Sequence, residues 1–188
     1  MHSVGVHVAT LVRHPDSGSG GVRSISASID RKLDGVLAIT FAIEGDLARV
    51  NVPLPSTPRI AHGLWQHTCC ECFIALPGNR GYHELNFAPS GEWAAYAFKT
   101  YREGAALEDE ALDPRIEARR SDRRLELDAM IALERLTAGY ARATLRLALS
   151  AVIEDEAGGL SYWALRHPAG KPDFHHRDAF VVELDSLE

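Results

Sequence analysis

Strict alternation of apolar and polar residues is the strongest local pattern in the sequence. In residues 141–153 every odd position is apolar, while Arg142, Thr144, Arg146 and Ser150 fall on the opposite side. Because successive side chains of a strand point to opposite faces, this pattern predicts a strand with one face on a core and the other toward water. Similar alternating or continuously apolar runs predict strands at residues 4–12, 22–29, 36–43, 125–132 and 179–184.

The middle third of the chain has the pattern of a β-meander. Strands are predicted at residues 70–76, 82–87 and 92–101, with turns rich in Gly and Pro between them. Residues 60–65 and 132–137 can each form at most a short helical turn. About ten short strands separated by turns predict an all-β fold of two packed antiparallel sheets, a β-sandwich. Because there is neither an internal repeat nor a linker between two cores, we expect residues 1–188 to form a single domain.

Composition narrows the classes of partner. With 188 residues, 46% of them hydrophobic, the chain can bury a substantial core. Its formal net charge of -6 argues against nucleic acid, whose binding proteins concentrate Lys and Arg on one surface. The first residues lack the basic segment and the uninterrupted apolar run of an export signal or a membrane span. We therefore expect a cytoplasmic protein that binds neither nucleic acid nor membranes.

Polar residues of the meander fall on one side of the predicted sheet. Glu71 of the first strand and Glu84 and Asn86 of the second can share a face, and we expect Trp93, Lys99 and Tyr101 of the third to join it. Sugars stack on Trp or Tyr and hydrogen-bond to such polar groups. Alternatively, the carboxylates pair with basic residues inside the sheet and the Trp side chains only fill the core.

Cysteine and histidine raise the question of a metal. Cys69, Cys70 and Cys72 lack the spacing of common zinc sites and are interpreted as buried apolar residues. His167, His175 and His176 gather near the end of the chain, but adjacent histidines in an extended segment point apart. Structural or ligand-bonding roles are favoured for them. The acidic run 103–113 and the basic run 119–124 are interpreted as solvated loops.

Three segments carry a resemblance to a known family. Residues 64–74 (LWQHTCCECFI), residues 82–98 with Tyr101 and Arg102, and the closing YWALRHP and KPDFHH stretches together resemble DOMON-like domains related to family 9 carbohydrate-binding modules. The resemblance implies a β-sandwich of immunoglobulin-like or jelly-roll type that binds sugars, or haem in other branches, on one face. It implies that Trp65 and Glu71 serve the ligand, with Asn86 and Arg102 beside them and Trp163 as a second aromatic wall.

The leading hypothesis is a non-catalytic module that binds a saccharide or a related polyhydroxy compound without a cofactor or metal. Its expected binding residues are Trp65, Glu71, Glu84, Asn86, Arg102, Trp163 and His175. A haem protein using Met130 and a histidine, or a divalent-metal protein using the C-terminal histidines, is the first alternative, and a protein-interaction module is the second. Common catalytic motifs are missing, and the only route to an enzyme is the use of Glu71 and Glu84 as an acid and a base on a glycoside.

Overall fold

The computed structural model describes residues 6–18 and 20–187 as a nearly all-β structure. Its strands are β1 (His7–Arg13), β2 (Val22–Arg31), β3 (Val36–Gly45), β4 (Cys69–Ala75), β5 (Tyr82–Phe87), β6 (Trp93–Thr100), β7 (Glu103–Ala106), β8 (Arg115–Arg120), β9 (Arg124–Ala132), β10 (Leu145–Glu154), β11 (Leu160–Ala164) and β12 (Val182–Leu184). All strand pairs are antiparallel. The prediction of an antiparallel β-sandwich is confirmed.

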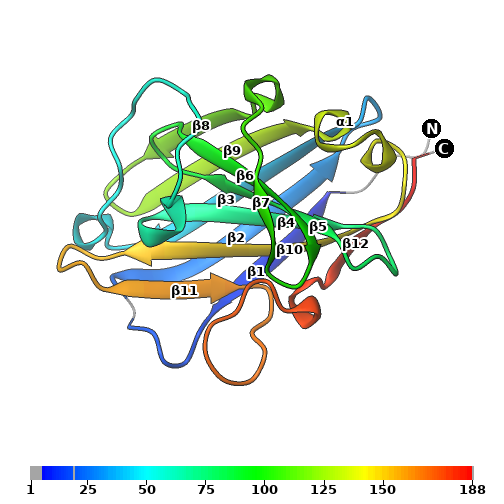
Figure 1. Cartoon of the computed structure of the whole chain (residues 1–188). Helices are drawn as coiled ribbons and strands as arrows, with labels where there is room; N and C mark the ends of the chain where they lie inside the picture. The colour runs from blue at the N-terminus through cyan, green and yellow to red at the C-terminus, as the bar shows by residue number, and fades with distance from the viewer. Residues whose placement is uncertain (1–5, 19, 188) are drawn as a thin grey trace.

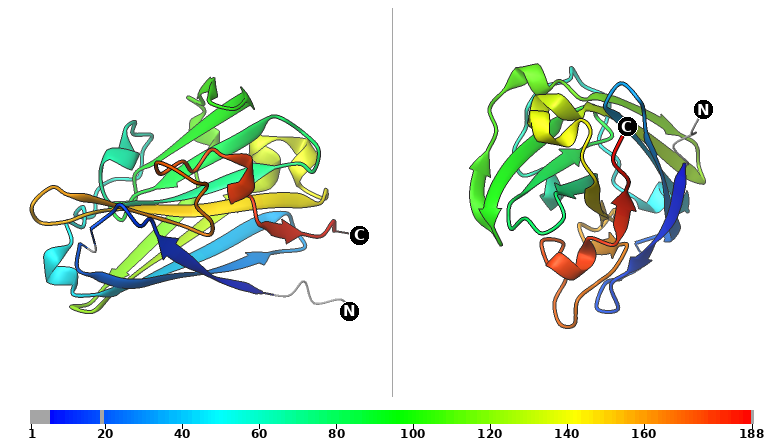
Figure 2. Two further views of the ribbon diagram at one scale, coloured as in Figure 1. Left: turned by 90° about the horizontal axis from the view of Figure 1, so that it is seen from below. Right: turned by 90° about the vertical axis from the view of Figure 1, so that its right-hand side faces the viewer.

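Two sheets face each other as layers (Figure 1, Figure 2). Sheet A has the order β1-β2-β3-β9-β8, and sheet B has the order β7-β6-β5-β4-β10-β11, with β12 pairing beside β10. Strand β1 joins them, because it pairs with β2 along most of its length and with β11 through Val12 and Arg13. The two layers are therefore parts of one continuous hydrogen-bonded ladder.

The main core lies between the sheets. Alternate residues of sheet A, such as Ile39 and Phe41, meet alternate residues of sheet B, such as Leu147 and Leu149. Cys70 and Cys72 also point into this core, while Cys69 points to the other face of β4, and all three are buried free thiols. The buried, apolar role predicted for the cysteines is thus observed.

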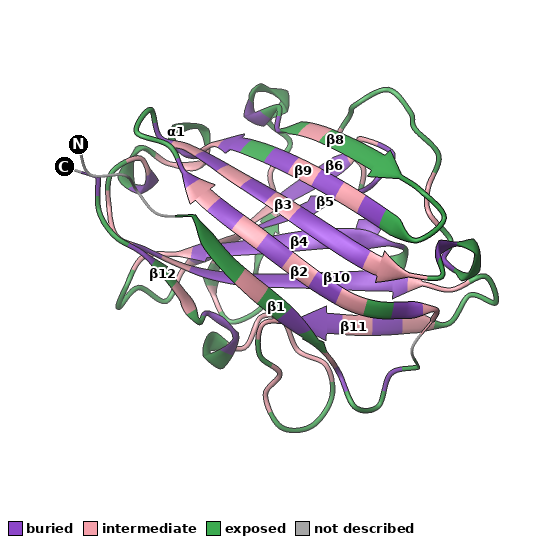
Figure 3. Cartoon of the chain, turned by 180° about the vertical axis from the view of Figure 1, so that it is seen from behind, coloured by how far each residue is buried: buried purple, intermediate pink, exposed green. Residues whose placement is uncertain are grey.

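The outer faces of the two sheets differ in burial. In Figure 3, β2, β3 and β9 alternate between buried and more exposed residues, whereas β4 and β10 are buried along nearly their whole length. The cover over sheet B comes from residues 165–181, whose Phe174 and Phe180 pack on its outer face. We call residues 165–181 the strap.

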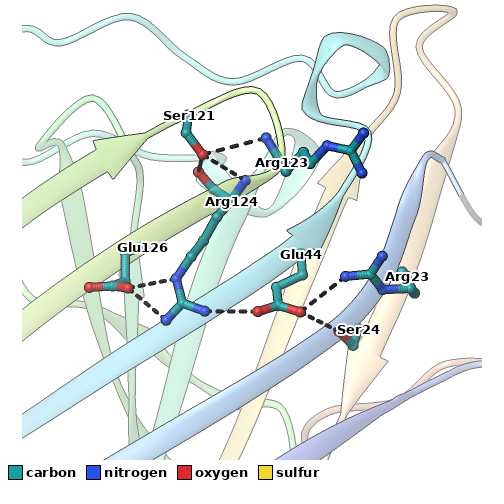
Figure 4. A network of polar contacts seen from close by, with 7 residues as sticks. All are labelled: Arg23, Ser24, Glu44, Ser121, Arg123, Arg124 and Glu126. Atoms are coloured by element: carbon teal, nitrogen blue, oxygen red, sulfur yellow. Dashed lines mark hydrogen bonds and ion pairs between the residues drawn. The ribbon is translucent and has the colours of Figure 1, made fainter.

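An ion-pair ladder runs across the exposed outer face of sheet A (Figure 4). Arg124 on β9 bonds Glu44 of β3 at 2.8 Å and Glu126 of its own strand at 2.6 Å. Arg23 adds a contact to Glu44, and Arg119 of β8 reaches Glu126. Acidic and basic residues alternate across these strands, so Arg23, Glu44, Arg119, Arg124 and Glu126 each have a partner of opposite charge.

Several predicted boundaries are wrong. Strands β7 and β8 lie in or beside the charged runs interpreted as loops, and β11 was not predicted. β10 begins at Leu145 because residues 141–144 form a turn, and β12 begins at Val182 because a 3-10 turn, η5 (Arg177–Ala179), precedes it. The predicted start of the first strand at residues 4–5 lies outside the described residues. Short helical turns do occur at η2 (Leu64–Gln66) and α1 (Leu133–Leu136).

Within the described part of the chain, no helix is long and apolar enough to cross a membrane. The single-domain organisation and the cytoplasmic location stay predictions.

Candidate functional site

A cleft of about 510 Å³ lies on the outer face of sheet B, between the strands and the strap. Its wall combines two acidic residues, several aromatic rings and two basic residues at the rim. The lining residues are Trp65, Glu71, Glu84, Tyr96, Phe98, Arg102, Val152, Tyr162, Lys171, Pro172, Phe174 and His175. Five residues predicted from sequence therefore meet in one cleft: Trp65, Glu71, Glu84, Arg102 and His175.

Strand pairing places the acidic residues on this face. Glu71 on β4 lies opposite Asn86 on β5 and opposite Ser150 on β10. Glu84, two residues before Asn86, therefore points the same way, and it pairs with Tyr96 on β6. The common face predicted for the two carboxylates and the amide is observed.

The predicted face of β6 is wrong. Trp93 lies opposite Phe87 and both side chains enter the main core. Residues of the other parity, Tyr96 and Phe98, point to the cleft instead. Lys99 and Tyr101 are also absent from the cleft lining.

Glu71 is the most deeply buried acidic residue of the cleft, with 2% of its surface exposed. Ser150 Oγ donates to Glu71 Oε2 at 2.8 Å, and Cys69 Sγ lies 3.8 Å from Oε1. Burial, together with the nearby negative charge of Glu84, raises the pKa of Glu71 well above the usual carboxyl range, against the smaller opposite effect of these hydrogen bonds. The site therefore disfavours full ionisation of both carboxyls.

Glu84 is 6% exposed and contacts two neutral groups. Asn86 Nδ2 donates to Glu84 Oε1 at 3.0 Å, and His175 Nε2 lies 3.6 Å from Oε2. Burial raises the pKa of Glu84, while Asn86 and the charge of Arg102 act in the opposite direction. Burial and Arg102 lower the pKa of His175 to about 4, so this imidazole is neutral at pH 7 and forms no ion pair with Glu84.

A hydrogen-bond chain holds His175 in place. The backbone N–H of Arg102 donates to Tyr82 Oη at 3.1 Å, and Tyr82 Oη lies 2.9 Å from His175 Nδ1. Tyr82 Oη and His175 Nδ1 thus share a hydrogen bond, and Nε2 is the ring nitrogen that faces Glu84.

Asn86 is fully buried and lies behind the cleft, so it does not line the wall. Its Nδ2 is used by Glu84, and its Oδ1 has no hydrogen-bond partner among the described residues. Asn86 therefore orients Glu84, and it leaves an unused acceptor beside the carboxylates.

The positive charge of Arg102 is held at the rim. Its guanidinium donates to Asp173 Oδ1 at 2.9 Å and to Tyr101 Oη at 3.3 Å, and Tyr101 in turn donates to Asp173 Oδ2 at 2.8 Å. Arg102 has a left-handed backbone, with a φ of 57°, in the turn between β6 and β7. The triad of Tyr101, Arg102 and Asp173 thus ties this turn to the strap.

Aromatic rings form the rest of the wall. Trp65 is half exposed, on the turn η2 that begins after Gly63 in a left-handed conformation. Tyr162 on β11 and Phe174 of the strap face each other with ring centroids 6.1 Å apart. Rings of this kind present flat apolar surfaces to a ligand.

Trp163 does not belong to this wall, and its proposed place there is corrected. It is only 4% exposed, points into the main core, and donates from Nε1 to Ser161 Oγ at 3.1 Å. Its neighbour Tyr162 lines the cleft because adjacent residues of a strand point to opposite faces. Tyr96, Phe98, Phe174 and Lys171 also line it and were missed from sequence.

The residues considered for a metal or haem have other contacts. His167 Nε2 lies 2.8 Å from the Val12 carbonyl, and His176 Nδ1 accepts from the Asp178 N–H at the start of η5. Among the described residues, no three His, Cys, Asp or Glu side chains are grouped to hold a metal ion. Met130 lies on the outer face of sheet A, and no histidine lines the hollow beside it.

A second hollow of about 540 Å³ lies at the other end of the same face. His175 borders both spaces, and the second one contains Arg80, Arg146 and Arg177 but no carboxylate. We place the candidate site in the first space because it contains the buried acidic residues.

No protein-family model and no curated protein sequence matches the chain. Among solved structures, a Bacteroides uniformis protein assigned as carbohydrate-binding is similar, with a TM-score of 0.60 and 12% identity over 93% of this chain and 84% of that one. A family 9 carbohydrate-binding module from Caldicellulosiruptor kristjanssonii, solved with cellotriose, is similar with a TM-score of 0.55 and 10% identity over 88% and 75%. At these identities the likeness establishes the fold, and the resemblance to DOMON-like domains stays a prediction.

Proposed function

We propose that the protein is a non-catalytic module that binds a saccharide, or a related polyhydroxy compound, in the cleft on sheet B. The observation that carries the proposal is the combination of buried acidic residues with a wall of aromatic rings in one open space. No metal or cofactor is part of the proposal.

The chemistry of the wall suits a sugar. A pyranose ring has apolar C–H faces that stack on aromatic rings, and Trp65 offers a half-exposed one. Its hydroxyls need acceptors, which Glu71 and Glu84 supply at the floor of the cleft. Arg102 and Lys171 at the rim can donate to hydroxyl or ring oxygens.

The comparisons support the same proposal at the level of the fold. A module with this fold binds cellotriose, and a second structure with this fold is assigned as carbohydrate-binding. Saccharide binding therefore requires no change of architecture, only suitable side chains on the sheet.

Calorimetric titration and thermal shift against a panel of mono- and disaccharides test the proposal. A ligand that binds only the folded state stabilises it by about 2.7 kcal/mol at one hundred times Kd. We expect a saccharide to raise the melting temperature, and Trp65→Ala to abolish or strongly weaken that shift.

Leu54→Ala is the matched control for Trp65→Ala, because Leu54 is a large apolar residue that is 81% exposed outside the cleft lining. It should leave the saccharide response unchanged. The proposal fails if no saccharide shifts the melting temperature, or if Trp65→Ala binds as well as the control.

A further inference from the structure

We infer that the preferred ligand is an amino sugar, a saccharide whose protonated amine binds at the floor of the cleft between Glu71 and Glu84. The inference rests on the proposed saccharide function and adds the chemical class of the ligand.

The floor of the cleft contains acidic residues without a cationic partner. The hydrogen-bond partners of Glu71 are the neutral side chains of Ser150 and Cys69. Those around Glu84 are Asn86 and His175, and His175 is neutral at pH 7. Among the described residues, neither carboxylate forms an ion pair with Lys or Arg.

The two basic residues of the cleft lie away from this floor or are already engaged. The Arg102 guanidinium is bound by Asp173 and Tyr101. Lys171 belongs to the strap and is exposed. A ligand therefore meets paired or solvated positive charge at the rim and unpaired carboxyl groups at the bottom.

Burying carboxylates without a partner is unfavourable, and an ammonium group in the ligand reverses that cost. It carries three N–H donors and a positive charge, whereas a sugar hydroxyl carries one donor and no charge. Because burial and the charge of Glu84 oppose full ionisation of both carboxyls, a single ammonium matches the floor better than two cations would.

The aromatic wall favours the same group. Tyr96 is the cross-strand neighbour of Glu84, and Phe98 follows on the same face of β6. A cation over the face of such rings is attracted by the negative charge of the ring face, most strongly where it is removed from water. The arginine-lined hollow beyond His175 has the opposite charge, so an ammonium should choose the cleft.

Calorimetric titration with three matched sets of ligands tests the inference. Each set compares one amino sugar with its neutral parent and its N-acetyl derivative: glucosamine with glucose and N-acetylglucosamine, and likewise for the galactose and mannose series. Within the set that fits the cleft, the amino sugar should bind at least about tenfold more tightly than both uncharged members, as expected for a charge-assisted hydrogen bond.

Glu71→Gln and Glu84→Gln keep the shape of the side chains and remove their charge. Each should reduce the preference for the amino sugar to less than about threefold, because the ammonium loses a negative charge to pair with, whatever the change in affinity for the neutral sugar. Glu117→Gln is the matched control, because Glu117 is an exposed carboxylate on β8 of sheet A. It should retain the full preference.

The outcomes separate the inference from the proposed function. Equal or tighter binding of a neutral parent overturns the amino-sugar inference and leaves saccharide binding in place. If no saccharide of any set binds, the proposed function fails and the inference fails with it. A preference that survives both Gln variants also contradicts the inference, because the charge would then be recognised elsewhere.

Discussion

The outer faces of the two sheets both carry acidic side chains, but these side chains differ in burial, in ion pairing and in the direction of their pKa shifts. On sheet A, Glu44 and Glu126 are partly exposed and bonded to Arg124, and the pKa of each is lowered by its arginine partners (Figure 4). On sheet B, Glu71 and Glu84 are buried among neutral groups and their pKa values are raised. The charges of this network on sheet A pair with one another, whereas the described residues of sheet B offer Glu71 and Glu84 no Lys or Arg partner.

The difference teaches that burial and pairing, and not the number of charges, distinguish a binding face from a solvated one. The ladder on sheet A has no aromatic wall and its arginines are solvated, so it has little to offer a ligand. The strap makes the difference on sheet B, because it lowers the exposure of the carboxylates and adds rings beside them.

The largest expected effect concerns packing under the strap. Phe73 is 1% exposed on the outer face of β4 and contacts His175 and Phe180 edge to face. Phe73→Ala should lower the free energy of unfolding by about 3–5 kcal/mol. Met130→Ala, at a 41% exposed position on the outer face of sheet A, should change it by less than about 0.5–1 kcal/mol. If urea denaturation gives the two variants equal losses in the free energy of unfolding, packing under the strap does not distinguish the outer face of sheet B from that of sheet A.

A second test exchanges one carboxylate on each face for its amide. Glu71→Gln should raise the free energy of unfolding at neutral pH, by on the order of 1–3 kcal/mol, because the amide is buried without the proton uptake that burial forces on the carboxyl. Glu126→Gln should slightly lower it, because Glu126 loses its contacts with Arg119 and Arg124. Two changes of the same sign in chemical denaturation would contradict the comparison.

The pH dependence of stability provides a third test. Because the folded protein holds protons on Glu71 and Glu84 that the unfolded chain releases near pH 4.3, the stability they provide is lost as pH rises through their raised pKa values. Between about pH 4.5 and 8, the melting temperature should fall with rising pH, because the folded-state pKa is raised to about 7 for Glu84 and to about 8 for Glu71. The double variant Glu71→Gln/Glu84→Gln should have a flatter profile, and an unchanged slope would refute this account.

His175 acts in the opposite direction at lower pH. Its pKa is lowered to about 4, so the unfolded chain takes up a proton first and stability is lost as pH falls from about 6.5 toward 4. Because the two carboxyls act in the other direction over this range, His175→Gln should steepen the rise in melting temperature on acidification from about pH 6.5 to 4.5, which the same melting experiments measure. A profile that is unchanged in the variant would contradict this role of His175.

The smallest expected effect concerns the ladder on sheet A. Arg124→Gln should cost little stability in dilute buffer, because the side chain is solvated and its pairs are exposed. In about 1 M sodium chloride, where the screening length is about 3 Å, the difference from the wild type should vanish. If the difference instead persists in high salt, the ladder contributes by packing and not by charge.

Sequence reasoning found the strands that alternate and missed those at the edges. Strands β2, β3 and β9 were predicted because one face of each is buried and the other is not. Strand β8 escaped because Arg115, Glu117 and Arg119 have the composition of a solvated loop, although Ile116 between them packs against the core. Charged, short edge strands protect a sheet from pairing with other chains, and for that reason they resemble loops.

Strand parity predicted only part of the site correctly. Glu71 and Glu84 were placed together because strand parity and a short turn fixed their common face. The face of β6 was mistaken because apolar residues occupy both of its sides, so no alternation shows which one meets Glu84. Trp163 was mistaken for the same reason, since Tyr162 beside it is also aromatic. Phe174 lies on the strap, and its place over the sheet depends on tertiary packing alone.

Both ends of the strap are fixed by strands that pair with β10. One edge of β10 pairs first with β12, through residues 145–147, and then with β11, through residues 150–154. The strap leaves β11 and returns at β12, so its two ends are anchored on the same strand. Changes in its length or sequence leave the ladder register of the sandwich intact and cost little closure entropy. The strap can therefore vary and change the outer face of sheet B while the strand order of the sandwich stays the same.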